Sequence, residues 1–247
     1  MTITNVVVGV DDSVESRAAE RWAGRYAEAA GVPLRVLHAD AEPVAALVEA
    51  SSGSTLLVLG ARDRGRLTAA LFGSVSGQVA VAAAGPVVVV REEVDPPGPV
   101  VVAVDAAGTS DAAVLFAFEE AARRGRELHA VHAWPVPALP SGAGSTGVMT
   151  STRYLPDAAL AVLATAVAAG RAAFPQVIVH ERLVTGHPEE VVPDETTDAA
   201  MLVVGSRGRT PLTGLLLGST SQALLHRSTG PVAVVRTENV AVVRTEN

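Results

Sequence analysis

The chain repeats one sequence unit, and this repeat limits the possible folds more than any other feature. Residues 56–91 align without a gap on residues 201–236, and about half of the positions are identical. Residues 6–11 likewise have a counterpart at residues 100–105. A sequence that recurs over such a length indicates a structural unit that is present twice. The chain is therefore predicted to contain two related domains.

Both copies alternate short apolar runs with longer helical patterns. Most of the apolar runs are rich in valine and apolar on both faces, which is typical of strands buried on both sides in a parallel sheet. The expected strands are residues 6–10, 34–38, 55–59 and 87–91 in the first copy, and 100–104, 128–134, 177–184, 201–204 and the run after Pro231 in the second. The expected helices are residues 13–30, 44–50, 74–84, 111–124, 156–174 and 220–226, with a short helix near Glu189. The pattern predicts an α/β fold of two tandem open parallel sheets, flavodoxin-like or Rossmann-like, with strand order 3-2-1-4-5.

The two copies differ by a deletion. The first copy has no counterpart of the helix and strand expected between residues 156 and 184. In the order 3-2-1-4-5 the missing strand is an edge strand, so its loss leaves the central pairings intact. We therefore expect a shortened domain at residues 1–94, a linker at 95–99, a complete domain at 100–239 and a duplicated tail at 240–247.

Two segments fall outside the repeat. Residues 135–153 are rich in Pro, Gly and Ser and are expected to form a loop. Residues 232–239 recur without change as residues 240–247, which fits either an additional edge strand or a loose tail. We favour the loose tail, and no ligand chemistry is assigned to it.

Composition narrows the classes of partner. The formal net charge is −7, which disfavours nonspecific binding to nucleic acid or to an anionic membrane. The absence of cysteine excludes disulfides and thiolate metal sites. No signal-like segment precedes the acidic pair Asp11-Asp12, and no apolar run approaches the about 20 residues of a membrane-spanning helix. We therefore expect a cytoplasmic protein that binds neither nucleic acid nor membrane.

A glycine pattern follows the strand expected at residues 201–204. Gly205 and Gly208 are separated by two residues, and Gly218-Ser219 follows after nine more. Small residues between a strand and a helix let backbone amides approach an anion closely, and the helix N-terminus adds partial positive charge. The pattern therefore has the chemistry of a phosphate-binding loop.

This spacing resembles the nucleotide-binding signature of the universal stress protein family, and the resemblance covers nearly the entire chain. It implies a bound adenine nucleotide, with ATP as the leading ligand and Mg²⁺ only alongside a triphosphate. Because ligands of open α/β sheets bind where the strand order reverses, Asp105 and Gly205 are expected to meet there. The resemblance implies a carboxylate near the ribose, adenine beside the second strand and phosphates on the glycine loop. The implied binding residues are Asp105, His132, Ala133, Gly205, Arg207, Gly208, Gly218, Ser219 and Thr220.

These residues also have purely structural interpretations. The glycines fit a simple turn, and Ser219 with Gln222 fits a helix-capping box. Asp105 fits a helix cap, although Asp11 at the same place in the first copy favours a shared local role. Arg207 is explained more simply as a solvated loop arginine than as a phosphate ligand.

The first copy keeps only part of the glycine pattern. The residues that match are Asp11, Gly60, Gly73 and Ser74. At the position of the second glycine stands Asp63, whose side chain adds bulk and negative charge where phosphates would lie. We therefore expect weak or absent nucleotide binding in the first copy.

Other chemistry finds little support in the sequence. There is no Walker lysine and no Gly-x-Ser-x-Gly elbow. His129 and His132 lie three residues apart on an expected strand, so they face opposite sides and no metal site is predicted. The predicted function is adenine-nucleotide binding that senses or signals stress or energy state, with no catalytic residue assigned. A slow ATP hydrolase and a nucleotide-free interaction scaffold are the alternatives.

The last expected strand of each copy suggests how the copies associate. Pro86 and Pro231 stand at the entry of these strands, a position that edge strands tolerate. An unpaired apolar edge invites a partner strand. In dimers of the universal stress protein family the final strands pair, so the resemblance implies an intramolecular pseudo-dimer here. A homodimer through edge strands is left open.

Overall fold

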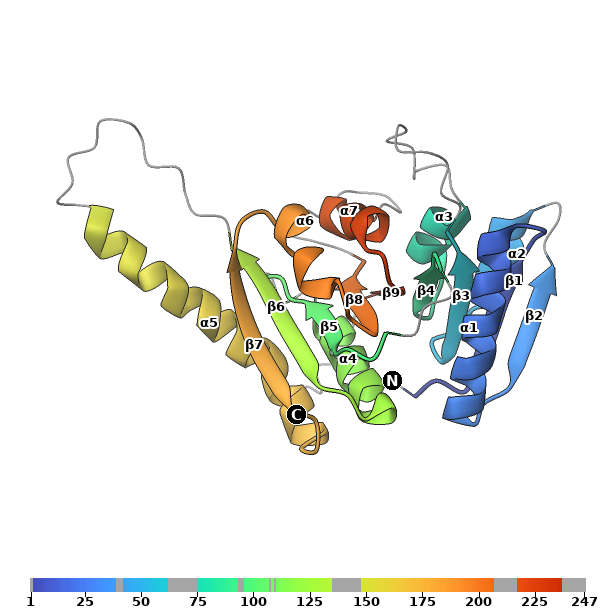
Figure 1. Ribbon diagram of the computed structural model, residues 1–247, viewed down its shortest axis with the longest axis horizontal. Coiled ribbons are helices and arrows are strands. Elements are labelled where there is room, and N and C mark those ends of the chain that lie inside the picture. The colour runs from blue at the N-terminus through green and yellow to red at the C-terminus, as the bar shows by residue number, and fades with distance from the viewer. Residues whose placement is uncertain are drawn as a thin grey trace, which may run out of the picture.

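The computed structural model describes residues 2–38, 42–61, 75–92, 96–106, 108, 110–134, 148–206 and 217–236. The first half contains β1 (Asn5–Val10), α1 (Val14–Ala30), β2 (Leu34–His38), α2 (Pro43–Glu49), β3 (Thr55–Gly60), α3 (Val75–Ala82) and β4 (Val87–Val90). The second half contains β5 (Val100–Ala103), α4 (Asp111–Arg124), β6 (Leu128–Trp134), α5 (Val148–Ala173), β7 (Val179–Thr185), α6 (Pro188–Val191), the 3-10 helix η2 (Asp194–Thr196), β8 (Met201–Gly205), α7 (Ser219–Arg227) and β9 (Val232–Val235). The two halves lie side by side (Figure 1).

The nine strands form one sheet in the order β2-β1-β3-β4-β9-β8-β5-β6-β7. Within each half all pairings are parallel. The second half has the order β7-β6-β5-β8-β9, which is the predicted order 3-2-1-4-5. The first half has the order β2-β1-β3-β4 and lacks the strand that would lie outside β2. The predicted fold class is therefore confirmed.

The two halves join through their last strands. β4 pairs with β9, and this pairing is antiparallel. Beyond β9, Arg236 donates to the carbonyls of Ala82 and Ala83 at the end of α3, at 3.4 and 3.2 Å. Beyond β4, Arg91 donates to the carbonyl of Leu225 in α7. The expected intramolecular pseudo-dimer is present.

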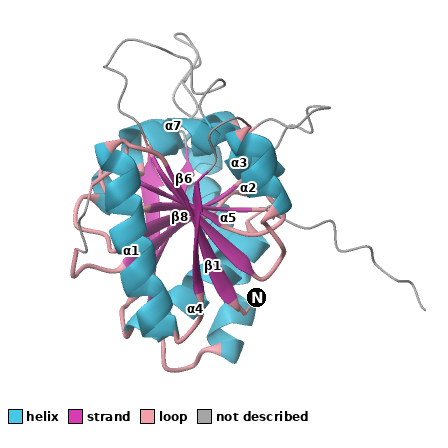
Figure 2. Cartoon of the chain, turned by 90° about the vertical axis from the view of Figure 1, so that its right-hand side faces the viewer, coloured by secondary structure: helices cyan, strands magenta, loops and turns pink. Residues whose placement is uncertain are grey.

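Helices cover both faces of the sheet (Figure 2). On one face, α1, α4 and α5 form a hydrophobic core with strand residues such as Val8 and Val102. On the other face, α2, α3 and α7 form a second core with residues such as Val7 and Val101. Neighbouring residues of a strand point to opposite faces, so each inner strand contributes to both cores. This explains why inner strands such as β4 and β8 are apolar throughout.

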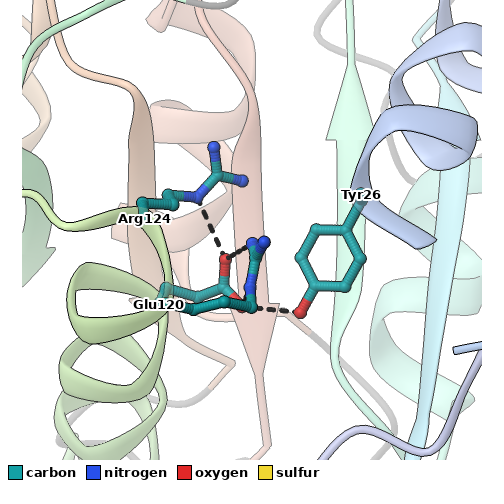
Figure 3. Close-up of polar contacts among 4 residues, drawn as sticks. Tyr26, Glu120 and Arg124 are labelled. Carbon is teal, nitrogen blue, oxygen red and sulfur yellow. Dashed lines mark hydrogen bonds and ion pairs between the residues drawn. The ribbon is translucent and has the colours of Figure 1, made fainter. Parts of the chain in front are cut away.

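A buried polar cluster links α1 of the first half to α4 of the second (Figure 3). The hydroxyl of Tyr26 donates to Oε1 of Glu120 at 2.6 Å. Arg123 and Arg124 bind Oε2 of Glu120 at 2.5 and 3.1 Å. The guanidinium of Arg123 also lies over the Tyr26 ring, 3.9 Å from its centroid. Glu120 is 2% exposed, and the two arginines compensate its buried charge.

One predicted boundary was wrong by more than two residues. α5 begins at Val148 and not at Pro156, so the loop expected at residues 135–153 was drawn too long. The last glycine of this region is Gly147, and residues 148–155 contain neither glycine nor proline. No local helix breaker therefore separates Gly147 from the predicted helix, and the turn signals end where α5 starts.

The other expected strands and helices begin and end within two residues of those in the structure, and η2 was not predicted. The duplicated tail at residues 240–247 and Asp95 of the linker lie outside the described residues. The proposed domain boundaries therefore stay predictions. Among the helices that the structure describes, none combines the length and the apolar character needed to cross a membrane.

Candidate functional site

Asp105 follows β5 at the carboxyl edge of the sheet. Its backbone N–H donates to the hydroxyl of Ser110 at 3.2 Å, and Ser110 is buried. In the first half, the N–H of Asp11 donates to the hydroxyl of Ser16 at 3.0 Å in the same way. The N-cap of α4 is Ser110, so the interpretation of Asp105 as a helix cap is wrong. The two aspartates share a local role in the turn that follows the first strand of each half.

His132 and Ala133 lie on β6, which is the neighbour of β5. His132 is 7% exposed, and its Nδ1 lies 2.8 Å from the carbonyl oxygen of Val104. Because a carbonyl only accepts, this contact places a proton on Nδ1. The N–H of Val104 donates in turn to the carbonyl of Val131 at 2.8 Å. These bonds hold the backbone directly before Asp105 against β6.

Two hydrogen bonds tie the end of β8 to the start of α7. The N–H of Gly218 donates to the carbonyl of Ser206 at 3.0 Å, and Oγ of Ser221 donates to the carbonyl of Gly205 at 2.5 Å. The N-cap of α7 is Gly218, a residue without a side chain that could form a capping hydrogen bond. The capping-box interpretation of Ser219 is therefore wrong. The two hydrogen bonds place the first turn of α7 beside the end of β8. Backbone amides in the first turn of a helix have no partner within the helix, so they can bind another group.

β5 lies between β6 and β8, so these groups meet at one edge of the sheet. The observed register, continued past the last pairs, sets Asp105 level with Ala133 on one side and Ser206 on the other. α4 packs on one face and α7 on the other, so the strand order reverses here. The expected binding residues that the structure brings to this edge are Asp105, His132, Ala133, Gly205, Gly218, Ser219 and Thr220. Arg207 and Gly208 lie outside the described residues.

The first half places Asp11 after β1 and Gly60 at the end of β3. Oδ1 of Asp11 accepts the N–H of Ser13 at 2.9 Å, so this carboxylate is engaged in its own turn. A Cβ on Gly60 would lie 2.6 Å from the backbone of Glu15, so the close packing of α1 on β3 explains this glycine. The remaining positions of the pattern, Asp63, Gly73 and Ser74, lie outside the described residues.

Sequence reasoning missed a second group of polar residues, at the amino ends of β6 and β7. Within the described part of the chain, Glu127, His129 and His180 bring ligand atoms within 4.8 Å of one another. The parallel pairing of β6 with β7 sets His129 directly opposite His180. Spacing along one strand relates His129 only to His132. The ring of His132 bonds instead to the carbonyl of Val104. The two histidines become neighbours through the register between β6 and β7, and the sequence does not give that register.

The universal stress protein family model matches residues 2–53, 39–91 and 98–236. A universal stress protein of Mycobacterium tuberculosis (strain H37Rv) is 34% identical in an alignment of length 292, which covers 94% of this chain and 96% of that protein. Another universal stress protein of the same strain is 36% identical over 217 residues, which cover 86% of this chain and 67% of that protein. The matches thus extend over both halves.

Solved structures share the fold. The crystal structure of a universal stress protein from Archaeoglobus fulgidus DSM 4304 matches with a TM-score of 0.63 at 20% identity, over 95% of this chain and 97% of that chain. A functionally unknown protein from Pseudomonas aeruginosa PAO1 matches with a TM-score of 0.61 at 18% identity, over 95% of this chain and 82% of that chain. On the family model and the sequence relatives together, the chain belongs to the universal stress protein family.

Proposed function

We propose that the second half binds an adenine nucleotide, with ATP as the leading ligand, at the carboxyl edge of β5, β6 and β8. The observation that carries the proposal is the placement of Asp105 beside the start of α7, where the strand order reverses. Membership of the universal stress protein family supports it, since the glycine spacing of the chain resembles the signature of that family.

The proposed contacts follow from the chemistry of each group. The amides at the N-terminus of α7 favour negative charge, and the hydroxyls of Ser219 and Thr220 add donors for phosphate oxygens. The carboxylate of Asp105 accepts hydrogen bonds from ribose hydroxyls. The adenine ring is assigned to the end of β6, beside His132. Gly208 keeps side-chain bulk away from the phosphates, and Mg²⁺ is proposed only with a bound triphosphate.

In the first half we propose weak or absent binding. Asp63 carries a negative charge at the position that Gly208 occupies in the second half, and like charges repel phosphate. The carboxylate of Asp11 already accepts the N–H of Ser13 at 2.9 Å.

The proposed role is to sense or signal energy or stress state, through a change in conformation or partner affinity on nucleotide binding. The chain contains no lysine at all, so a lysine cannot stabilise the charge of a transferring phosphoryl group. This favours binding over rapid turnover. Self-association is proposed through β2 and β7, which are the outer strands of the sheet. A cytoplasmic location is proposed as the default. No binding to nucleic acid is proposed, because the net charge of −7 disfavours nonspecific adhesion to it.

Isothermal titration calorimetry on the full chain tests the proposed binding. ATP, ADP and cyclic AMP are titrated separately into protein stripped of nucleotide. We expect Asp105→Asn to weaken nucleotide binding at least about tenfold, because a hydrogen bond to a charged group contributes about 1.5–3 kcal/mol. Asp11→Asn is the matched control in the first half and should change the affinity less than about twofold. Circular dichroism checks that both variants are folded.

The ultraviolet spectrum of the freshly purified protein gives an independent test. The chain has only two Trp and two Tyr, so a copurified nucleotide would visibly distort its absorbance. Protein that carries no nucleotide and gives no heat with any of the three ligands would contradict the proposal. ATP turnover above background that disappears in Gly208→Asp would instead indicate the slow hydrolase.

A further inference from the structure

The cluster of Glu127, His129 and His180 lies at the opposite ends of β6 and β7 from the proposed nucleotide site. His129 and His180 are direct partners in the parallel pairing, so their side chains leave the sheet on the same face. Their rings meet edge to face, with centroids 5.1 Å apart. Glu127 immediately precedes β6, and its Oε2 lies 3.1 Å from Nε2 of His180 and 3.9 Å from Nε2 of His129.

These distances suit a shared metal ion. Zinc binds imidazole nitrogen and carboxylate oxygen at about 2.0–2.2 Å, so two ligand atoms of a tetrahedral site are about 3.3–3.5 Å apart. The separation of 3.1 Å between His180 and Glu127 is already close to this value. Nε2 of His129 lies 3.9 Å from Oε2 of Glu127, and the three ligand atoms all lie within 4.8 Å of one another, so these side chains would have to move closer together to hold one ion. The Glu127 side chain is 52% exposed and has room to move.

A metal ion would displace a proton from the cluster and would lie near one cation. Nε2 of His180 is hydrogen-bonded to Oε2 of Glu127 at 3.1 Å. A metal ion would take the place of the shared proton, because metal binding releases protons from its ligands. Arg182 is the cation that would repel a metal ion, and its Nε pairs with Oε2 of Glu195 at 2.7 Å. That ion pair offsets much of the repulsion.

We propose that Glu127, His129 and His180 bind one divalent transition-metal ion of the Zn²⁺ class. Two imidazoles and one carboxylate are a donor set of three-ligand zinc sites, in which water takes the fourth position. Mg²⁺ and Ca²⁺ prefer oxygen ligands and are disfavoured here. The ion would fasten β7, an outer strand of the sheet, to β6 and to the residue that precedes it. This site is independent of the proposed nucleotide site.

Calorimetric titration of the full chain with Zn²⁺ tests the proposal, using protein without a histidine tag and without nucleotide. We expect one Zn²⁺ per chain and no heat with Mg²⁺. His180→Ala and Glu127→Gln should each weaken Zn²⁺ binding at least about tenfold, because each removes a ligand. His187→Ala is the matched control, since His187 is exposed and lies outside the cluster. It should change the affinity less than about twofold.

Two further readouts keep the test independent of any one variant. Zn²⁺ should raise the melting temperature of the wild-type protein but not that of His180→Ala, because a ligand that binds only the folded state stabilises it. Co²⁺ should give the visible absorption of a nitrogen- and oxygen-ligated site in the wild type alone. Equal Zn²⁺ affinity of the wild type and both ligand variants would overturn the proposal. The absence of binding by the wild type at about 100 μM Zn²⁺ would also overturn it. The cluster would then be a hydrogen-bonded pair, Glu127 with His180, beside His129.

Discussion

Tyr26 and Glu120 show how single residues of the two halves come together. Both lie fifteen residues after the aspartate that follows the first strand of their half, Asp11 and Asp105 (26 − 11 and 120 − 105). They therefore occupy equivalent positions of the repeat, and they meet at 2.6 Å. Burial and then the negative charge of Glu120 raise the pKa of Tyr26 above its ordinary value.

This shift predicts a pH dependence of stability. The pKa of Tyr26 is raised from 10.0 on folding, so its contribution is complete below about pH 10 and is lost as the pH rises above that value. We expect the free energy of unfolding to fall more steeply above about pH 10 in the wild type than in Tyr26→Phe. Urea unfolding, followed by circular dichroism between about pH 8 and pH 11, measures it.

The chain is well suited to this measurement. It has no lysine and no cysteine, and Tyr154 is its only other tyrosine, so few groups titrate in this range. Tyr26→Phe should also lower the free energy of unfolding by about 1–3 kcal/mol at neutral pH, because a hydrogen bond to a charged group is lost. Parallel pH profiles of the two proteins would contradict a pKa of Tyr26 that is raised on folding.

Replacing each of two glycines of the first half by alanine should change the free energy of unfolding in opposite directions. A Cβ at Gly60 would lie 2.6 Å from the backbone of Glu15, whereas a Cβ at Gly24, within α1, would meet nothing within 4 Å. Gly60→Ala should therefore lower the free energy of unfolding by about 2 kcal/mol or more. Gly24→Ala should raise it by up to about 1 kcal/mol, because alanine favours the helix. Chemical denaturation measures both, and equal stability of Gly60→Ala and the wild type would refute the close contact.

At the scale of elements, the deletion in the first half exposes one side of β2. In the second half α5 covers the equivalent face of β6 and β7. Leu34 on β2 is 37% exposed, whereas its counterpart Leu128 on β6 is fully buried. The missing helix accounts for this difference.

The same deletion predicts unequal effects of one substitution at these two positions. Leu128→Ala should lower the free energy of unfolding by about 2–5 kcal/mol, because it leaves a cavity. Leu34→Ala should lower it by less than about 1 kcal/mol, since much of that side chain already contacts water. Thermal and urea unfolding of the two variants compare them directly. Similar losses would mean that some other part of the chain covers β2.

The strands were predictable because the valine-rich runs occur at corresponding positions in both copies of the repeat. The strand order, the missing edge strand and the position of Asp105 follow from that pattern and are seen in the structure. The start of α5 was placed at Pro156 because proline is favoured at the first position of a helix. In the structure Pro156 lies inside α5, which begins eight residues earlier, at Val148 (156 − 148). The alternative interpretation of Ser219 as the cap of α7 is wrong, because the chain enters the helix one residue earlier, at Gly218.

The cluster of Glu127, His129 and His180 could not be predicted from spacing within one strand. His129 and His180 belong to different strands, and only the pairing register sets them opposite each other. Sequence patterns give the face of a residue within its own strand, but they do not give the register between strands. Sites built across neighbouring strands are therefore the ones that sequence reasoning misses here.

At the scale of the whole molecule, the two halves complete a single sheet. The final strands of the two halves, β4 and β9, pair with each other. Arg91, after β4, and Arg236, after β9, each bind a helix of the other half. Among the described strands, those with an unpaired side are therefore the two outer ones, β2 and β7. Within this frame the halves have diverged, since one keeps the glycine pattern and the other replaces its second glycine by Asp63.

The stoichiometry of nucleotide binding tests this divergence most directly. A calorimetric titration of the full chain with ATP should give one nucleotide per chain. Gly208→Asp, which copies the first half into the second, should abolish that binding. Two nucleotides per chain, unchanged binding by Gly208→Asp, or no binding at all would contradict a single nucleotide site in the second half.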